Sequence, residues 1–148
     1  FNACLKGRPR DMTVALHVCR GNFKGHFLSE GGYGVVARRM FNDLDIDAYF
    51  LEFDTPRAGD FAPLADVPKG KSVVLGIVST KTATLESVDA VKRRIDEAGR
   101  FLSLDQLALS PQCGFASAVS GNPVTYADQT AKLRLVVDIA NDVWGRGA

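Results

Sequence analysis

His17 and Cys19 stand two residues apart at the end of an apolar run, in the segment ALHVCRGN over residues 15–22. Residues two apart on a β-strand point to the same side, so one ion can be within reach of both the imidazole and the thiol. The same pattern is compatible with a histidine and a cysteine packed in a core strand. The spacing alone therefore permits a metal site without requiring one.

Two later residues extend this candidate site. Glu52 interrupts the apolar run AYFLEF, where an unpaired carboxylate would be costly to bury, and Cys113 follows the run LALS in a turn-forming SPQCG segment. Two thiols, an imidazole and a carboxylate are a set typical of zinc, and the sulfur ligands disfavour magnesium and calcium. The alternative is that Glu52 pairs with Arg57 or another base, while Cys113 is simply buried.

The charged residues and glycines near these positions could be simple loop residues or could contribute to binding. Asp54, Arg57 and Asp60 follow Glu52 in a predicted loop, where charges are usually solvated, although they could also hold the glutamate or a zwitterionic substrate. Residues 32–37 match the G-x-G-x-x-A dinucleotide pattern, but loop-like residues precede it, so we interpret its glycines as loop residues. His26 is predicted to be a surface histidine.

The elements that must position these side chains alternate between strands and helices. Short, near-continuous apolar runs fit strands that are covered on both faces, as in a parallel sheet. Leu85 begins a series of apolar residues that are spaced at the period of a helix. The alternation predicts right-handed crossovers, with functional groups at the carboxyl edge of the sheet. We expect strands at 13–19, 48–53, 72–78 and 107–110, helices at 34–44, 85–98 and 125–143, and a loop with about one helical turn at 54–71.

Four such strands are half of a (β/α)8 barrel of the TIM type. A chain of 148 residues with 46% hydrophobic and 24% charged residues has the composition of an ordinary soluble domain. Its net charge of +1 does not indicate an extensive basic surface that would bind nucleic acid or an anionic membrane. The absence of a long apolar run and the three widely spaced cysteines predict a cytoplasmic location with reduced thiols.

The segments HVCRGN, FLEFDTPRAGDF, SVVLGIVSTKT and LALSPQCGFAS, in this order, resemble the C-terminal catalytic domain of cobalamin-independent methionine synthase, and more closely its short single-domain relatives. The resemblance implies an α/β TIM barrel, of which residues 1–148 would be roughly the C-terminal half. It also implies a Zn²⁺ ion bound by His17, Cys19, Glu52 and Cys113. The implied reaction transfers a methyl group from 5-methyltetrahydrofolate, or a related donor, to the thiol of homocysteine.

The chain departs from the family pattern on the side of the methyl donor. Where full-length synthases carry a histidine after the third of these strands, this sequence reads STKTATLE, with Lys81 nearest to that place. We therefore assign Lys81 to the donor side of the reaction. The expected substrate-binding residues are Arg20, Asn22, Asp54 and Arg57.

The family's earlier strands, which grip much of the substrate, have no counterpart here. We expect either a longer chain or a second copy of this one to complete the barrel, and we favour the longer chain. The expected partners are a small-molecule thiol and a methyl donor, without nucleic acid or membrane. The alternatives are zinc-dependent alkyl transfer to another thiol, and a non-catalytic domain that binds zinc or a ligand.

Overall fold

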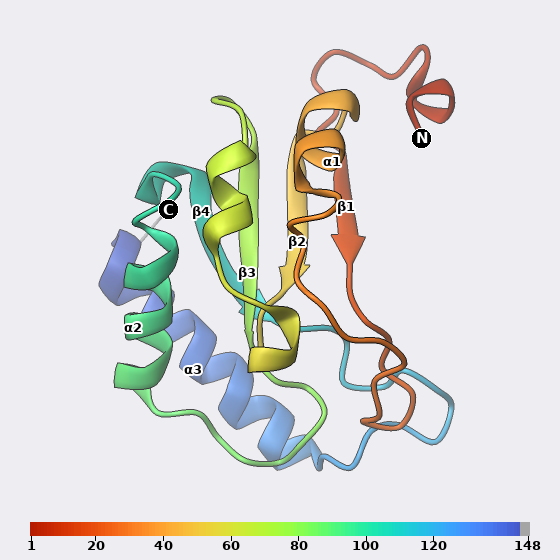
Figure 1. Cartoon of the computed structure of the whole chain (residues 1–148). Coiled ribbons are helices and arrows are strands. Elements are labelled where there is room, and N and C mark those ends of the chain that lie inside the picture. The colour runs from red at the N-terminus through yellow and green to blue at the C-terminus, as the bar shows by residue number, and fades with distance from the viewer. Residues whose placement is uncertain (146–148) are drawn as a thin grey trace.

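The computed structural model describes residues 1–145, which form one parallel sheet of four strands in the order β1-β2-β3-β4 (Figure 1). The strands are β1 (Ala15–Val18), β2 (Ala48–Glu52), β3 (Ser72–Val78) and β4 (Leu107–Pro111). The helices are α1 (Ala37–Asp43), α2 (Val88–Ala98) and α3 (Tyr126–Trp144), joined by the short 3-10 helices η1 (Asn2–Leu5), η2 (Pro56–Ala58), η3 (Ala62–Asp66) and η4 (Leu104–Gln106).

The four predicted strands are confirmed to within two residues at each end. The boundaries of two helices differ from the prediction. Helix α2 starts at Val88 because the side chain of Ser87 caps it, accepting from the Ala90 N–H at 3.2 Å, so Leu85 lies outside the helix and half exposed. Helix α1 starts at Ala37, three residues after the predicted Gly34. The predicted loop at 54–71 contains the two 3-10 helices η2 and η3 instead of one turn.

Helix α3 begins at the predicted capping box, in which the side chains of Thr125 and Asp128 each accept from the other residue's backbone N–H. Its buried face, however, lies beside the one that we predicted. The residues Leu135, Val136 and Ile139 are buried, while Leu133 and Val137 of the predicted stripe are exposed. Within residues 1–145, no helix combines the length and the apolarity that crossing a membrane requires.

Alternate residues of the strands lie in two different environments. Tyr49, Leu51, Val73 and Leu75 are at most 1% exposed and share one core with apolar residues of all three helices. On the opposite face, a row in register across the sheet runs through His17, Phe50, Val74 and Ala108, and the side chain of Phe50 is 38% exposed. The prediction that both faces are covered is therefore wrong for the described chain, because its helices pack on one face.

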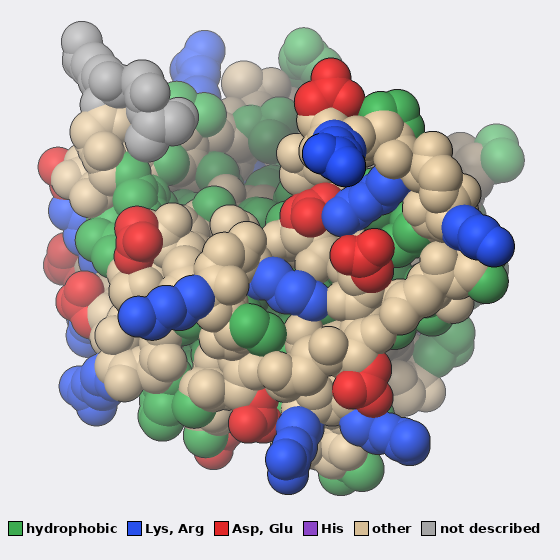
Figure 2. All heavy atoms as spheres, turned by 90° about the horizontal axis from the view of Figure 1, so that it is seen from above, with side chains coloured by type: hydrophobic (Ala, Val, Ile, Leu, Met, Phe, Trp, Pro, Cys, Tyr) green, Lys and Arg blue, Asp and Glu red, His purple; other side chains and the backbone are tan. Residues whose placement is uncertain are grey.

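The two ends of the strands also differ. Seen from above, at the amino ends of the strands, basic and acidic side chains lie interspersed over the surface (Figure 2). At the carboxyl edge, the loops after β1, β3 and β4 meet one another (Figure 1). Two contacts tie them: the Lys24 N–H donates to Ser117 Oγ at 3.2 Å, and Asn122 Nδ2 donates to the Thr80 carbonyl at 3.0 Å.

Candidate metal centre

The side chains of His17, Cys19 and Cys113 come together at this carboxyl edge. Although β1 and β4 lie at opposite edges of the sheet, the segment after β4 passes the ends of the middle strands and reaches the end of β1 (Figure 1). The Gln112 N–H anchors the start of that segment by donating to the Val78 carbonyl at 2.8 Å. The route of this loop, rather than strand pairing, therefore joins Cys113 to His17.

The donor atoms of these three residues all lie within 4.8 Å of one another, and His17 Nε2 is 3.3 Å from Cys113 Sγ. Ligands that surround a tetrahedral zinc ion at about 2.0–2.3 Å lie roughly 3.3–3.8 Å apart, so the distance from His17 Nε2 to Cys113 Sγ matches that between two zinc ligands. Two thiols and an imidazole also match zinc in chemistry. Among residues 1–145, this is the one group of three or more such side chains that meets the spacing.

Glu52, the fourth residue implied by the resemblance, lies outside this group. Its carboxylate is fully buried, and Oε1 pairs with the Arg57 guanidinium and with Lys81 Nζ at 3.2 Å. Oε2 accepts from the Arg20 backbone N–H at 2.6 Å. Glu52 therefore forms the ion pair with Arg57 that the sequence also allows, while its role as a metal ligand stays a prediction.

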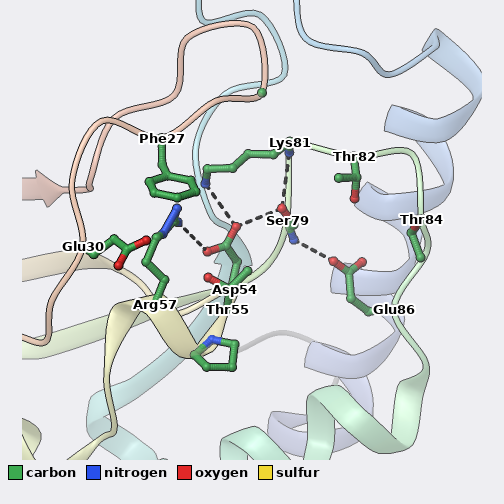
Figure 3. Close-up of a pocket in the computed structure, with 12 residues that line it drawn as sticks. Phe27, Glu30, Asp54, Thr55, Arg57, Ser79, Lys81, Thr82, Thr84 and Glu86 are labelled. Atoms are coloured by element: carbon green, nitrogen blue, oxygen red, sulfur yellow. Dashed lines mark hydrogen bonds and ion pairs between the residues drawn. The ribbon is translucent and has the colours of Figure 1, made fainter.

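Asp54 extends this ion-pair cluster. Its buried carboxylate accepts from Ser79 Oγ at 2.9 Å and from Lys81 Nζ at 3.1 Å, while Arg57 Nη2 lies 3.5 Å from its other oxygen. The Arg57 guanidinium also stacks on the Phe27 ring, 4.1 Å from its centroid. Two acids and two bases thus form a compact, almost fully buried cluster. Figure 3 shows three of its members, Asp54, Arg57 and Lys81.

The other two predicted substrate residues have their polar groups bound within the protein. The Arg20 guanidinium donates to the carbonyls of Gly31 and Ala58, at 2.6 and 3.2 Å, and to the Tyr33 hydroxyl at 3.0 Å. Asn22 Nδ2 donates to Thr80 Oγ1 at 3.1 Å. These contacts fix the loop after β1 against the ends of β2 and β3.

The environment shifts the pKa values of Glu52, in the ion-pair cluster, and of Cys113, in the candidate metal site. Burial opposes the ionisation of Glu52, but the Arg20 N–H together with the Lys81 and Arg57 cations outweighs it and holds the pKa of this carboxyl below its ordinary value. Burial raises the pKa of the Cys113 thiol to about 12, and the neighbouring Cys19 adds to the rise. Without a metal ion, Cys113 is therefore a neutral thiol at physiological pH.

A cleft of about 590 Å³ adjoins the ion-pair cluster. Arg57 and Lys81 approach Asp54 from its two sides, and the loop that carries Phe27 and Glu30 faces the loop of residues 79–86 (Figure 3). A second cleft, of about 300 Å³, is lined by His17, Phe50 and residues 110–114. The candidate metal ligands and the ion-pair cluster thus each face a hollow in the surface.

Sequence reasoning missed two residues that organise the centre. Tyr33 is buried between the predicted loop glycines, and its hydroxyl donates to the Val18 carbonyl at 2.9 Å and accepts from the Glu52 N–H at 2.8 Å. Gln112 is 2% exposed, and its Nε2 donates to Cys113 Sγ at 2.8 Å. An aromatic residue between glycines, and an amide beside a candidate ligand, were the available signals. His26 is exposed, as predicted.

A model of the cobalamin-independent synthase catalytic domain matches residues 4–142. The chain is 53% identical to YxjG, an uncharacterized protein of Bacillus subtilis, over 97% of this chain and 38% of the relative. A methionine synthase of Pyrococcus abyssi is 29% identical over 77% of this chain and 30% of the relative. The chain thus spans well under half of the length of the curated relatives that it matches.

Solved structures show the same fold. A candidate vitamin-B12-independent methionine synthase from Listeria monocytogenes superimposes with a TM-score of 0.70 and 33% identity, over 98% of this chain and 39% of the other. A B12-independent methionine synthase from Shewanella sp. W3-18-1, in complex with selenomethionine, gives a TM-score of 0.74 at 23% identity, over 95% of this chain and 40% of the other. The four-stranded sheet is therefore part of a TIM-barrel fold, as the strand order predicts.

Proposed function

Because the chain belongs to the cobalamin-independent methionine synthase family, we propose that its protein transfers a methyl group from 5-methyltetrahydrofolate, or a related donor, to the thiol of homocysteine, forming methionine. Residues 1–148 would be the C-terminal part of one barrel domain. Since the chain spans 38% of YxjG, we assign the complete activity to a whole barrel. A longer chain is the favoured source of the remaining strands, and a second copy is the alternative.

The observation that carries this proposal is the meeting of His17, Cys19 and Cys113 at an accessible edge of the sheet. When bound there, zinc would lower the pKa of a coordinating thiol, so that the thiol reacts as a thiolate at neutral pH. The protein supports the two sulfur ligands with N–H donors, from Gly21 N to Cys19 Sγ at 3.4 Å and from Gln112 Nε2 to Cys113 Sγ at 2.8 Å. Such donors orient ligands and stabilise their negative charge.

The donor side of the reaction is proposed to use the larger cleft. Lys81 lines it, and an ammonium group can give a proton to the nitrogen that the methyl group leaves. Asp54 and Arg57 also line this cleft and are proposed to contact a substrate there. Arg20 and Asn22, whose polar groups are engaged within the protein, serve the site by holding its loop.

The test measures zinc content and methyl transfer in the complete gene product. Cys113→Ala should lose stoichiometric zinc and the methyl transfer activity together, because it removes a sulfur ligand. Cys4→Ala is the matched control, because Cys4 is exposed in η1, outside the candidate site, and its loss should change neither quantity. A Cys113→Ala protein that keeps both zinc and activity would contradict the proposal.

Two alternatives give different results in the same protein. If the acceptor is another thiol, zinc remains bound and homocysteine is inert, while a different thiol accepts the alkyl group. If the metal site is only structural, all its positions are filled by protein ligands, and added thiol leaves the visible spectrum of the cobalt-substituted protein unchanged. A catalytic site should gain a sulfur ligand from homocysteine and change that spectrum.

A further inference from the structure

We propose that Lys132, in helix α3, is a positioning residue that acts through Glu86. Together they fix the loop of residues 79–87 as one wall of the larger cleft, and so determine where the side chain of Lys81 lies. The inference deepens the proposed function and rests on it, because this cleft is where the methyl donor is proposed to bind. Lys132 itself is not among the residues that line the cleft, so any effect on the donor passes through its neighbours.

Lys132 is a fully buried cation. Its side chain is 0% exposed, and its ammonium group donates to the Thr84 carbonyl and, at 2.9 Å, to Glu86 Oε2. Burial of an ammonium group is costly, and the replacement of a buried ion pair by apolar residues of similar size is often neutral or stabilising. Stability alone therefore does not account for a lysine at this position. The role of the pair lies in what its contacts hold in place.

The contacts of Lys132 hold the end of the loop that follows β3. Residues 79–87 form neither helix nor strand, so side-chain contacts must satisfy part of their backbone and fix its path. Glu86 Oε1 accepts from the Ser79 N–H at 2.8 Å and joins the two ends of the loop across seven positions (Figure 3). Since Oε2 pairs with Lys132, one carboxylate ties the loop both to itself and to α3.

The chain of contacts continues from Ser79 to Lys81. Ser79 Oγ donates to Asp54 Oδ2 at 2.9 Å and accepts from the Lys81 N–H at 3.3 Å. The same Asp54 oxygen accepts from Lys81 Nζ at 3.1 Å (Figure 3). The backbone and the ammonium group of Lys81 are thus both held relative to Ser79. A displacement of Glu86 should therefore also displace the ammonium group that is proposed to face the methyl donor.

The effect of this chain should be confined to the donor side. A misplacement of about 1 Å at a reacting group can cost about a hundredfold in rate. The candidate metal ligands His17, Cys19 and Cys113 lie at the end of β1 and in the segment after β4, and the contacts from Lys132 to Lys81 do not pass through them. Loss of the Lys132–Glu86 pair should therefore impair use of the methyl donor and spare binding of the thiol.

The first experiment measures steady-state methyl transfer by the complete gene product, with 5-methyltetrahydrofolate and homocysteine varied in turn. Lys132→Met keeps an unbranched side chain in the buried position and removes the ammonium group. The KM for 5-methyltetrahydrofolate should rise at least fivefold, while the KM for homocysteine and the zinc content stay within about twofold of the wild type. An unchanged donor KM in the folded variant, or an equal rise in both KM values, would overturn the inference.

Two further variants test whether the effect belongs to this ion pair. Lys92→Met is the matched control, because Lys92 of α2 also pairs with α3, through Asp142, but at the surface and outside the cleft. It should change neither KM, and a donor effect as large as that of Lys132→Met would count against the inference. Adding Glu86→Gln to Lys132→Met removes the unpaired carboxylate and keeps an oxygen for the Ser79 N–H. The donor KM should then return to within about twofold of the wild type, and no recovery in a folded double variant refutes the proposed chain.

The second experiment does not depend on methyl transfer. Amide hydrogen exchange, followed by mass spectrometry, should be at least tenfold faster at residues 79–87 in Lys132→Met than in the wild type, with the exchange of residues 15–18 unchanged. Wild-type exchange at 79–87 in this variant would show that Lys132 does not hold the loop. If Lys132→Met does not fold, Ser79→Ala breaks the same chain at Oγ and should raise the donor KM at least threefold. An unchanged donor KM in Ser79→Ala would then refute the inference.

These results separate the inference from the proposed function. A wild-type protein that transfers no methyl group refutes the reaction, and hydrogen exchange at residues 79–87 then decides whether Lys132 positions the loop. An active wild type whose Lys132→Met variant keeps the donor KM refutes the positioning role alone. Circular dichroism of each variant checks that the sheet is still formed.

Discussion

The two faces of the sheet use the same four strands for different purposes. On the face that carries the helices, Leu51 and Leu75 are at most 1% exposed and belong to the core. On the other face, Phe50 stays 38% exposed and His17 reaches the carboxyl edge as a candidate ligand. Stability is therefore concentrated on one face, while the other leaves side chains exposed, among them that of the candidate ligand His17.

The largest effect is expected on the helix-covered face. Leu51→Ala should lower the free energy of unfolding by about 3 kcal/mol, because it leaves a cavity among closely packed neighbours. Urea unfolding followed by circular dichroism measures this change. A loss below about 1 kcal/mol would mean that this face is not the main source of stability.

A smaller effect is expected for the pH dependence of zinc binding at the carboxyl edge, where the free energy of binding should change by about 1.4 kcal/mol per pH unit. Because the pKa of the free Cys113 thiol is raised to about 12, its binding as a thiolate must release a proton at any pH from 6 to 9. Cys113 alone should therefore make the zinc affinity rise about tenfold per pH unit, and fall equally as the pH is lowered.

Chelator competition at several pH values measures this dependence. Cys113→Ser is the control, and its slope should be smaller than that of the wild type by about one proton. Equal slopes in the two proteins would show that Cys113 does not bind the metal as a thiolate.

The smallest effect is expected for Phe50, the neighbour of Leu51 that points to the other face. In the 148-residue chain, Phe50→Ala should lower the free energy of unfolding by about 1 kcal/mol, because this ring is already partly in water. The measurement is the same urea titration as for Leu51→Ala. A loss as large as that of Leu51→Ala would show that a second copy covers this face.

The sheet and three side chains of the candidate site could be predicted because they follow from local patterns. Continuous apolar runs mark the four strands, and the carboxyl edge of a parallel sheet gathers His17, Cys19 and Cys113. The partners of Glu52 could be ranked less well. Arg57 lies five residues away and is a candidate partner from the sequence, but Lys81 lies 29 positions away, so only the packed loops show which bases surround the carboxylate.

The predicted helices differ from the structure where a local cap or a tertiary contact overrides a periodic pattern. Leu85 fits the apolar stripe of α2 in spacing, yet Ser87 caps the helix after it. The stripe of α3 was displaced because its buried side is set by the position of the sheet, with Ile139 inside and Val137 outside. Helical period gives the spacing of a buried face but does not fix its direction when apolar residues occur on several sides.

His17 lies on β1 and Cys113 lies two residues after β4, so they are next to the two outermost strands, and 96 positions separate them in the sequence. A metal ion held by both would act as a crosslink that closes a loop of this length. The closure entropy of such a loop is about 4 kcal/mol on the ideal-chain estimate. The same ion that activates a thiol would therefore also resist the separation of the outer strands, and a chelator would loosen the whole sheet from its two edges inward.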